Sequence, residues 1–195
     1  MDKKSKIFVT GSGGMVGRTL VSMLQRKGYI NLFLTKSGDL DLRNQIKVDE
    51  FFSREKPDYV IHLAARVGGI VANITNPIEF LTDNMRIGMN VINASFKHNV
   101  KKLLNLGSSC IYPRDCRQPM KEEYLLSGKL EPTNEGYALA KIAVLKLCEY
   151  YFIQHGCNFI SLMPPNLYGI NDNFDEKNSH VLSALISRFH KAKIN

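Results

Sequence analysis

A glycine-rich turn near the amino terminus constrains the fold of this 195-residue chain more than any other feature. The apolar segment Lys6–Thr10 leads into Gly11-Ser12-Gly13-Gly14-Met15-Val16-Gly17, which opens an amphipathic stretch at Met15–Lys27. Such a turn between a strand and a helix is typical of a dinucleotide site: Gly11 permits the bend, Gly14 lets a pyrophosphate approach, and Gly17 lets the helix pack closely. The helix N-terminus adds amide donors. A glycine turn without a ligand is the alternative, but the position favours a cofactor.

Short apolar runs alternate with amphipathic stretches along the chain, which predicts an α/β fold with a parallel sheet. The expected strands are Lys6–Thr10, Asn31–Thr35, Tyr59–Leu63, Lys102–Leu106 and Asn158–Met163. The expected helices are Met15–Lys27, Gln45–Glu55, Asn84–Asn99, Tyr137–His155 and Ser179–Lys193. Gly28 should end the first helix in the left-handed conformation, and Ser179 should cap the last one. We expect a Rossmann-type, doubly wound sheet.

Composition and charge exclude several classes of protein. With 44% hydrophobic residues the chain is not disordered, and no apolar run approaches the roughly 20 residues that span a bilayer. The start, MDKKSKIFVTG, does not resemble a signal peptide, and the four cysteines lack CxxC or metal-type spacing, so we expect reduced thiols, no metal and a cytoplasmic location. The net charge of +8 favours an anionic partner. Because the basic residues are scattered, a phosphorylated small molecule fits better than nucleic acid.

The segment after the second strand bears on the type of cofactor. An NAD site usually has an acidic residue there for the ribose 2′-hydroxyl, but this chain has Thr35-Lys36-Ser37-Gly38. An ammonium and hydroxyls suit a 2′-phosphate, so NADP(H) is favoured over NAD(H), although Lys36 could equally be a solvated surface residue. Asp41 and Leu42 are candidates for contacting adenine.

A tyrosine and a lysine four residues apart, Tyr137 and Lys141, share one face of a predicted helix. A neighbouring ammonium should lower the pKa of the phenol toward neutrality. Gly107 and Ser108 follow a predicted strand, where the carboxyl edge of a parallel sheet meets its ligand. Ser108 is therefore expected to hydrogen-bond a substrate carbonyl that Tyr137 protonates.

Several longer stretches resemble the extended short-chain dehydrogenase/reductase family and, within it, the GDP-L-fucose synthases, which epimerise and reduce GDP-4-keto-6-deoxymannose. The stretches cover nearly the whole chain: GSGGMVG, HLAARVGGIVAN, NMRIGMNVI, LGSSCIYP, EGYALAK, MPPNLYG and NDNFDEKNSHVLSALISRFHKA. The resemblance implies a GDP-sugar substrate, NADP(H) as cofactor, and Ser108, Tyr137 and Lys141 as the reductase set. It also implies that Cys110 and His180 form the acid/base pair for epimerisation.

The same resemblance implies further binding residues. Ser108, Ser109 and Arg188 would contact the substrate, with Arg188 at its diphosphate. Besides the glycine turn, cofactor contacts are implied at Leu106, Gly107, Lys141, Pro164, Pro165, Asn166, Leu167 and His180. Gly13 is a departure, because some members of the family carry a phosphate-binding arginine at that position.

Chain length sets the last expectations. Synthases of the resembled family continue well past residue 195, so we expect an NADP(H)-binding domain in residues 1–172 and only the start of a substrate-binding domain in residues 173–195. The helices at 84–99 and 137–155 pair across a homodimer in that family. Two alternatives stay open: another sugar-nucleotide epimerase or dehydratase, and a truncated, catalytically silent NADP-binding fragment.

Overall fold

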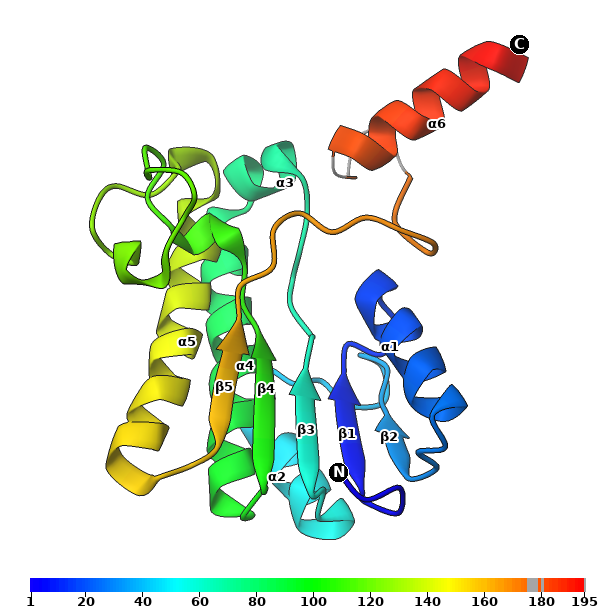
Figure 1. Ribbon diagram of the computed structural model, residues 1–195, viewed down its shortest axis with the longest axis vertical. Coiled ribbons are helices and arrows are strands. Elements are labelled where there is room, and N and C mark those ends of the chain that lie inside the picture. The colour runs from blue at the N-terminus through cyan, green and yellow to red at the C-terminus, as the bar shows by residue number, and fades with distance from the viewer. Residues whose placement is uncertain (175–178, 180, 195) are drawn as a thin grey trace.

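Five parallel strands form a single sheet in the computed structural model, which describes residues 1–174, 179 and 181–194 (Figure 1). The strands are β1 (Ile7–Thr10), β2 (Leu32–Leu34), β3 (Tyr59–His62), β4 (Lys102–Leu106) and β5 (Phe159–Leu162). Their order is β2-β1-β3-β4-β5, with Ile7 paired to both Leu32 and Tyr59. The strand order reverses between β1 and β3, which places the expected ligand crevice at the carboxyl ends of those strands. The five predicted strands and the parallel sheet are confirmed.

The helices are α1 (Met15–Arg26), α2 (Gln45–Glu55), α3 (Ile70–Thr75), α4 (Pro77–Lys97), α5 (Glu135–His155) and α6 (Val181–Ile194). Gly28 follows α1 with φ +81°, as predicted for the end of that helix. The prediction of a helix start at Asn84 is wrong, because α4 begins at Pro77. Proline suits the first turn of a helix, where its missing N–H is not needed. The short α3 was not predicted.

Helices cover both faces of the sheet, which makes it doubly wound. Alternate residues of β1 point to opposite faces: Phe8 packs with α2, α4 and α5, whereas Ile7 and Val9 pack with Val21 and Leu24 of α1. The predicted Rossmann-type class is therefore confirmed. Among the described helices only α1 packs on this second face, where Leu162 of β5 stays 49% exposed.

The two long helices α4 and α5 lie side by side on the first face (Figure 1). Gly88 of α4 allows this approach, because a Cβ there would meet the Val144 side chain of α5, with Cγ1 only 2.8 Å away. Gly136, near the start of α5, lies similarly against the carbonyl oxygen of Pro77. This packing sets α5, which carries Tyr137 and Lys141, at a fixed height beside β4.

The last helix stands apart from the sheet. The segment after β5 crosses the carboxyl edge toward α1, and α6 projects beyond that edge (Figure 1). The predicted Ser179 cap is wrong, because the Ser179 hydroxyl has no hydrogen-bond partner. The described part of the chain contains no helix long and apolar enough to cross a membrane.

Candidate active site

The glycine turn after β1 is shaped by close backbone contacts. Gly11 has φ +69°, and a Cβ on it would lie 2.8 Å from the backbone nitrogen of Ala64. A Cβ on Gly17 would collide with the carbonyl oxygen of Gly11, whose oxygen also accepts a hydrogen bond from the Gly14 amide at 3.1 Å. Gly13 is exposed, with nothing within 4 Å of a Cβ built there. The result is an open backbone cradle at a helix N-terminus, which fits the phosphates of a dinucleotide.

Two buried side chains, Thr10 and His62, support the glycine turn. The Thr10 hydroxyl accepts hydrogen bonds from the amides of Leu63 and Ala64, both at 3.1 Å, and lies 2.8 Å from Nδ1 of His62. The hydroxyl is therefore placed to donate its own hydrogen to a neutral imidazole. Burial, with a smaller contribution from the charge of Lys141, lowers the pKa of His62 to about 3. The pair ties the ends of β1 and β3 together and sets Ala64 against the glycine turn.

The residues predicted to hold the adenosine end lie around the end of β2. Ser12 donates a hydrogen bond to the Thr35 carbonyl at 3.4 Å, and Lys36 is exposed on the turn that follows. The Asp41 carboxylate accepts hydrogen bonds from the side chain and the backbone amide of Arg43, at 2.9 to 3.3 Å, which lower the pKa of that carboxyl. The side chain of Leu42 is buried in the hydrophobic core, and its carbonyl oxygen accepts a hydrogen bond from Asn90 at 2.9 Å. The contacts of these residues with the cofactor stay predictions.

Lys141 is a buried ammonium on the carboxyl side of the sheet, next to the end of β4. It is 6% exposed, and its Nζ donates a hydrogen bond to the carbonyl oxygen of Leu106 at 2.8 Å. The same Nζ lies 5.8 Å from the centroid of the Tyr137 ring. Burial lowers the pKa of Lys141 to about 8. The helix thus brings the predicted pair together beside the last residue of β4.

The pKa of Tyr137 moves in the opposite direction from the sequence prediction. Burial and then the nearby Cys110 raise it to about 12, while a hydrogen bond with Ser108 acts the other way. The expected lowering by Lys141 is therefore wrong for this structure. The physical reason is that the phenol is buried and lies near Cys110, and both raise its pKa. At neutral pH Tyr137 is a protonated phenol, which suits a proton donor.

The loop after β4 presents the remaining predicted groups beside Tyr137. Ser108 precedes the short 3₁₀ helix η1 (Ser109–Ile111), and its hydroxyl accepts a hydrogen bond from the Cys110 amide at 3.3 Å. The Ser109 amide donates to the Pro164 carbonyl at 3.1 Å, which fixes this loop against the segment after β5. Ser109, Cys110 and Asn166 line a cavity of about 300 Å³. Ser108, Cys110 and Tyr137 therefore meet at one corner of the site.

Comparison with known proteins places the chain in a family. The model of the NAD dependent epimerase/dehydratase family matches residues 7–195. The chain belongs to that family. A "GDP-L-fucose synthase 1" from Arabidopsis thaliana is 57% identical over 194 residues, which are 100% of this chain and 60% of the relative. A "GDP-L-fucose synthase" from Escherichia coli is 50% identical over 189 residues, 97% of this chain and 59% of the relative.

Solved structures agree with this membership in the NAD dependent epimerase/dehydratase family. A GDP-D-glycero-L-gluco-heptose synthase from Campylobacter jejuni, solved in the presence of NADPH, matches with TM-score 0.96 and 45% identity over 100% of this chain and 57% of its own. A GDP-L-fucose synthetase from Naegleria fowleri bound to NADP matches with TM-score 0.88 and 31% identity over 98% of this chain and 63% of its own. This chain thus spans about 60% of the length of the curated synthases it matches.

The other implied residues of the epimerase/dehydratase site lie on the carboxyl side of β5. Pro165, Asn166 and Leu167 are exposed on the segment that crosses the carboxyl edge of the sheet. Arg188 is an exposed residue of α6, and its contact with a substrate stays a prediction. His180, predicted both as an epimerisation residue and as a cofactor contact, lies outside the described residues.

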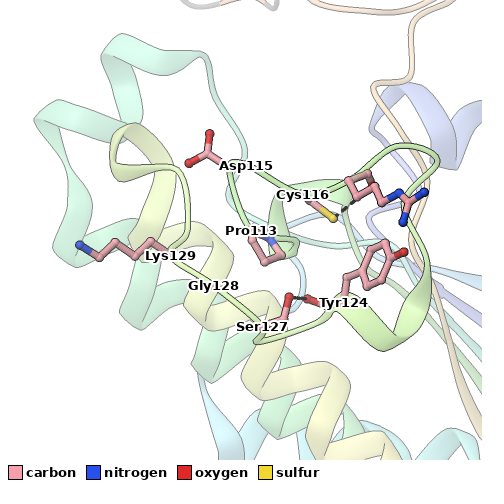
Figure 2. Close-up of a pocket in the computed structure, with 8 residues that line it drawn as sticks. Pro113, Asp115, Cys116, Tyr124, Ser127, Gly128 and Lys129 are labelled. Atoms are coloured by element: carbon pink, nitrogen blue, oxygen red, sulfur yellow. Dashed lines mark hydrogen bonds between the residues drawn. The ribbon is translucent and has the colours of Figure 1, made fainter.

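A loop that no sequence motif marks borders the corner formed by Ser108, Cys110 and Tyr137. Residues 113–131 carry no periodic pattern, yet they form much of the wall around Cys110 and enclose a second cavity of about 510 Å³ (Figure 2). Pro113 and Cys116 line both cavities. Ser127 closes the loop by donating to the Tyr124 carbonyl at 2.8 Å. The only signal in the sequence was position, since this loop directly follows Tyr112 and precedes the helix that bears Tyr137.

Proposed function

We propose that this chain is the cofactor-binding and catalytic part of a GDP-L-fucose synthase. It would bind NADP(H), epimerise GDP-4-keto-6-deoxy-D-mannose at C3 and C5, and reduce it at C4 to GDP-L-fucose. One observation carries the proposal: Ser108, Cys110 and Tyr137 interact at the corner where β4 meets α5. A reductase needs the serine and the tyrosine, but only an added epimerisation step gives a thiol beside them a role. The similarity to the curated synthases supports this reading.

The reduction step follows from the protonation state of the corner. The bound dinucleotide supplies a hydride to C4 of the sugar. Ser108 holds the C4 carbonyl, and Tyr137, a phenol with its pKa raised to about 12, delivers the proton to the oxygen. Lys141, with its pKa lowered to about 8 by burial, lies close enough to stabilise the tyrosinate that is left.

The epimerisation uses the same ketone. The C4 carbonyl acidifies the hydrogens on C3 and C5, and Ser108 and Tyr137 stabilise the enolate oxygen that forms when one is removed. Inversion requires a base on one face of the ring and an acid on the other. We assign Cys110 to one face and His180 to the other, because a thiol and an imidazole can each take up and return a proton.

A homodimer through α4 and α5 is part of the proposal. Apolar side chains of both helices stay exposed in the single chain, among them Met89 at 41%, Phe152 at 62% and Ile153 at 67%. Burial of these side chains against a second copy would remove apolar surface from water. Cross-linking or light scattering on the purified chain checks this part separately.

Isotope exchange tests the proposed function. The purified chain is incubated in D₂O with GDP-4-keto-6-deoxymannose and NADPH, while NADPH absorbance and deuterium at C3 and C5 are followed. Loss of NADPH with deuterium at both carbons is expected. Loss of NADPH without deuterium would instead favour a reductase that lacks the epimerase pair, and exchange without NADPH loss would favour another sugar-nucleotide epimerase.

Substitutions of two free cysteines, Cys110 and Cys116, provide a test variant and its matched control. Cys110→Ala should lose deuterium entry at C3 and C5 and keep its affinity for NADPH. Cys116→Ala, which removes a thiol from the same cavity wall, should keep both. Equal effects of the two variants would contradict the role assigned to Cys110.

The alternative of a catalytically silent NADP-binding fragment has its own support. The chain spans about 60% of its curated relatives, and α6 has no extensive interface with another described helix or strand. Cofactor binding without either reduction or exchange in the isotope experiment would favour this alternative.

A further inference from the structure

Arg18 lies in the first turn of α1 and folds back over the glycine turn. Its Nε donates a hydrogen bond to the carbonyl oxygen of Gly13 at 2.8 Å, and Nη1 approaches Oδ1 of Asn171 at 3.4 Å. Gly13 belongs to the cradle after β1, and Asn171 belongs to the segment that crosses the carboxyl edge after β5. The guanidinium therefore sits between the two stretches of chain that border the cradle.

The charge of Arg18 is poorly matched to its surroundings in the free protein. A helix N-terminus carries partial positive charge, so a cation in the first turn is unfavourable unless an anion lies beside it. The first turn of α1 has no acidic residue, and Gly14 at its N-cap offers no side chain. Within the described residues Arg18 forms no ion pair with a carboxylate, and it is exposed. An anion at this place is what the local electrostatics lack.

The space next to Arg18 is open. Nothing lies within 4 Å of a Cβ built on Gly13, so the surface beside the guanidinium can admit a ligand. On the other side of the turn, Ser12 contacts the end of β2, where the exposed ammonium of Lys36 follows. Two exposed cations thus lie near the glycine turn, Arg18 in α1 and Lys36 in the turn after β2.

We propose that Arg18 binds a phosphate of the dinucleotide and supplies the cation that the glycine turn itself lacks. The proposal rests on the proposed NADP(H) cofactor. Arg18 keeps its bond to the Gly13 carbonyl through Nε and turns the outer edge of its guanidinium to the phosphate, an arrangement that uses the fork geometry of arginine. Two phosphate groups share this chemistry, the pyrophosphate and the 2′-phosphate, and the experiment distinguishes them.

Direct binding measurements test the role of Arg18. Dissociation constants for NADPH and NADH are measured by calorimetry or cofactor fluorescence for the wild-type chain and for Arg18→Gln, which keeps a hydrogen-bond donor for Gly13 but removes the charge. We expect about 10- to 100-fold weaker binding, the usual cost of losing a charge-assisted hydrogen bond. A loss for NADPH alone assigns the 2′-phosphate, and an equal loss for both nucleotides assigns the pyrophosphate.

Arg26→Ala is the matched control, because it removes the same charge from the far end of the same helix. It should leave both dissociation constants within about twofold of wild type. The affinity of the wild-type chain should also fall more steeply with salt than that of Arg18→Gln, which a purely structural role would not cause.

The outcomes separate this inference from the proposed function. Unchanged affinity of Arg18→Gln for both nucleotides, or an equal loss in Arg26→Ala, overturns the role of Arg18 and leaves the cofactor assignment standing. A wild-type chain that binds neither nucleotide overturns both.

Discussion

Two regions on the carboxyl side of the sheet, the glycine turn after β1 and the corner after β4, are built by opposite means. At β1 the cradle exists because side chains are absent: Gly11 and Gly17 leave no room for a Cβ. At β4 the corner exists because polar side chains are buried: Lys141 and Tyr137 are enclosed, and burial shifts the pKa of both. At the glycine turn, the same close backbone contacts stabilise the fold and shape the phosphate cradle, so stability and function do not conflict there. At the corner after β4, stability and function conflict, because burying the ammonium of Lys141 lowers the free energy of unfolding.

The largest effect is expected at the catalytic corner. Tyr137→Phe removes only the phenolic oxygen, so NADPH loss with the keto sugar should slow by about 10²- to 10⁴-fold while the affinity for NADPH changes little. Steady-state kinetics and cofactor titration measure the two quantities. Tyr124→Phe, in the neighbouring loop, is the control and should keep its rate. Equal rates of the two variants would remove Tyr137 from the reaction.

The glycine end should respond to one added methyl group. Gly17→Ala forces a Cβ onto the Gly11 carbonyl, so the free energy of unfolding should fall by about 1–3 kcal/mol, and NADPH should bind at least about tenfold more weakly. Urea denaturation and cofactor titration give both values. Gly13→Ala adds the same methyl group to open space and should leave the free energy of unfolding unchanged, so a similar loss of stability in Gly13→Ala would refute the steric argument.

Removing the buried charge at the corner after β4 should raise the free energy of unfolding, whereas Gly17→Ala at the glycine turn should lower it. Lys141→Met removes a buried ammonium whose pKa is lowered from 10.5 to about 8, so at pH 7 the variant should be more stable by about 2 kcal/mol, after allowing for the lost hydrogen bond to Leu106. The cost in the wild type is fully present below pH 8 and is relieved as the pH rises from 8 toward 10.5. Urea denaturation at pH 7 and pH 10 should therefore show the advantage of the variant shrinking. If Lys141→Met were less stable than the wild type at pH 7, the contrast between the glycine turn and the corner after β4 would be contradicted.

The smallest effect concerns the buried histidine under the glycine turn. The pKa of His62 is lowered from 6.5 to about 3, so the unfolded chain binds the extra proton first, and stability is lost as the pH falls from 6.5 toward 3. At pH 5.5 this loss is about 1 kcal/mol relative to pH 7 or above. His62→Asn should be less stable than wild type at pH 7 but should lack this component. The comparison of unfolding free energies at pH 7.5 and 5.5 checks it, and identical losses in both proteins would contradict the linkage.

The fold could be predicted from the sequence wherever local pattern and tertiary packing agree. All five strands were found because short apolar runs lie between clear turn residues, and Gly28 marked the end of α1. The start of α4 was missed because Pro77 was not taken as a helix start. The Ser179 cap failed because the sequence cannot show that its hydroxyl forms no hydrogen bond in the fold.

The candidate site was predictable in membership but not in electrostatics. Spacing placed Tyr137 and Lys141 on one helix face, and the turn after β4 placed Ser108 beside them. The direction of the Tyr137 pKa shift was wrong, because no local pattern shows that the phenol is buried. The wall formed by residues 113–131 was also missed, since it depends on how a patternless loop folds back.

The segment between β5 and α6 joins the two ends of the sheet edge. It is held near Ser109 through the Pro164 carbonyl and near the glycine turn through Asn171 and Arg18. A displacement of this one segment should therefore shift both the loop that carries Cys110 and the glycine turn. Nucleotide and sugar should consequently bind with heterotropic linkage, each raising the affinity of the other by the same factor.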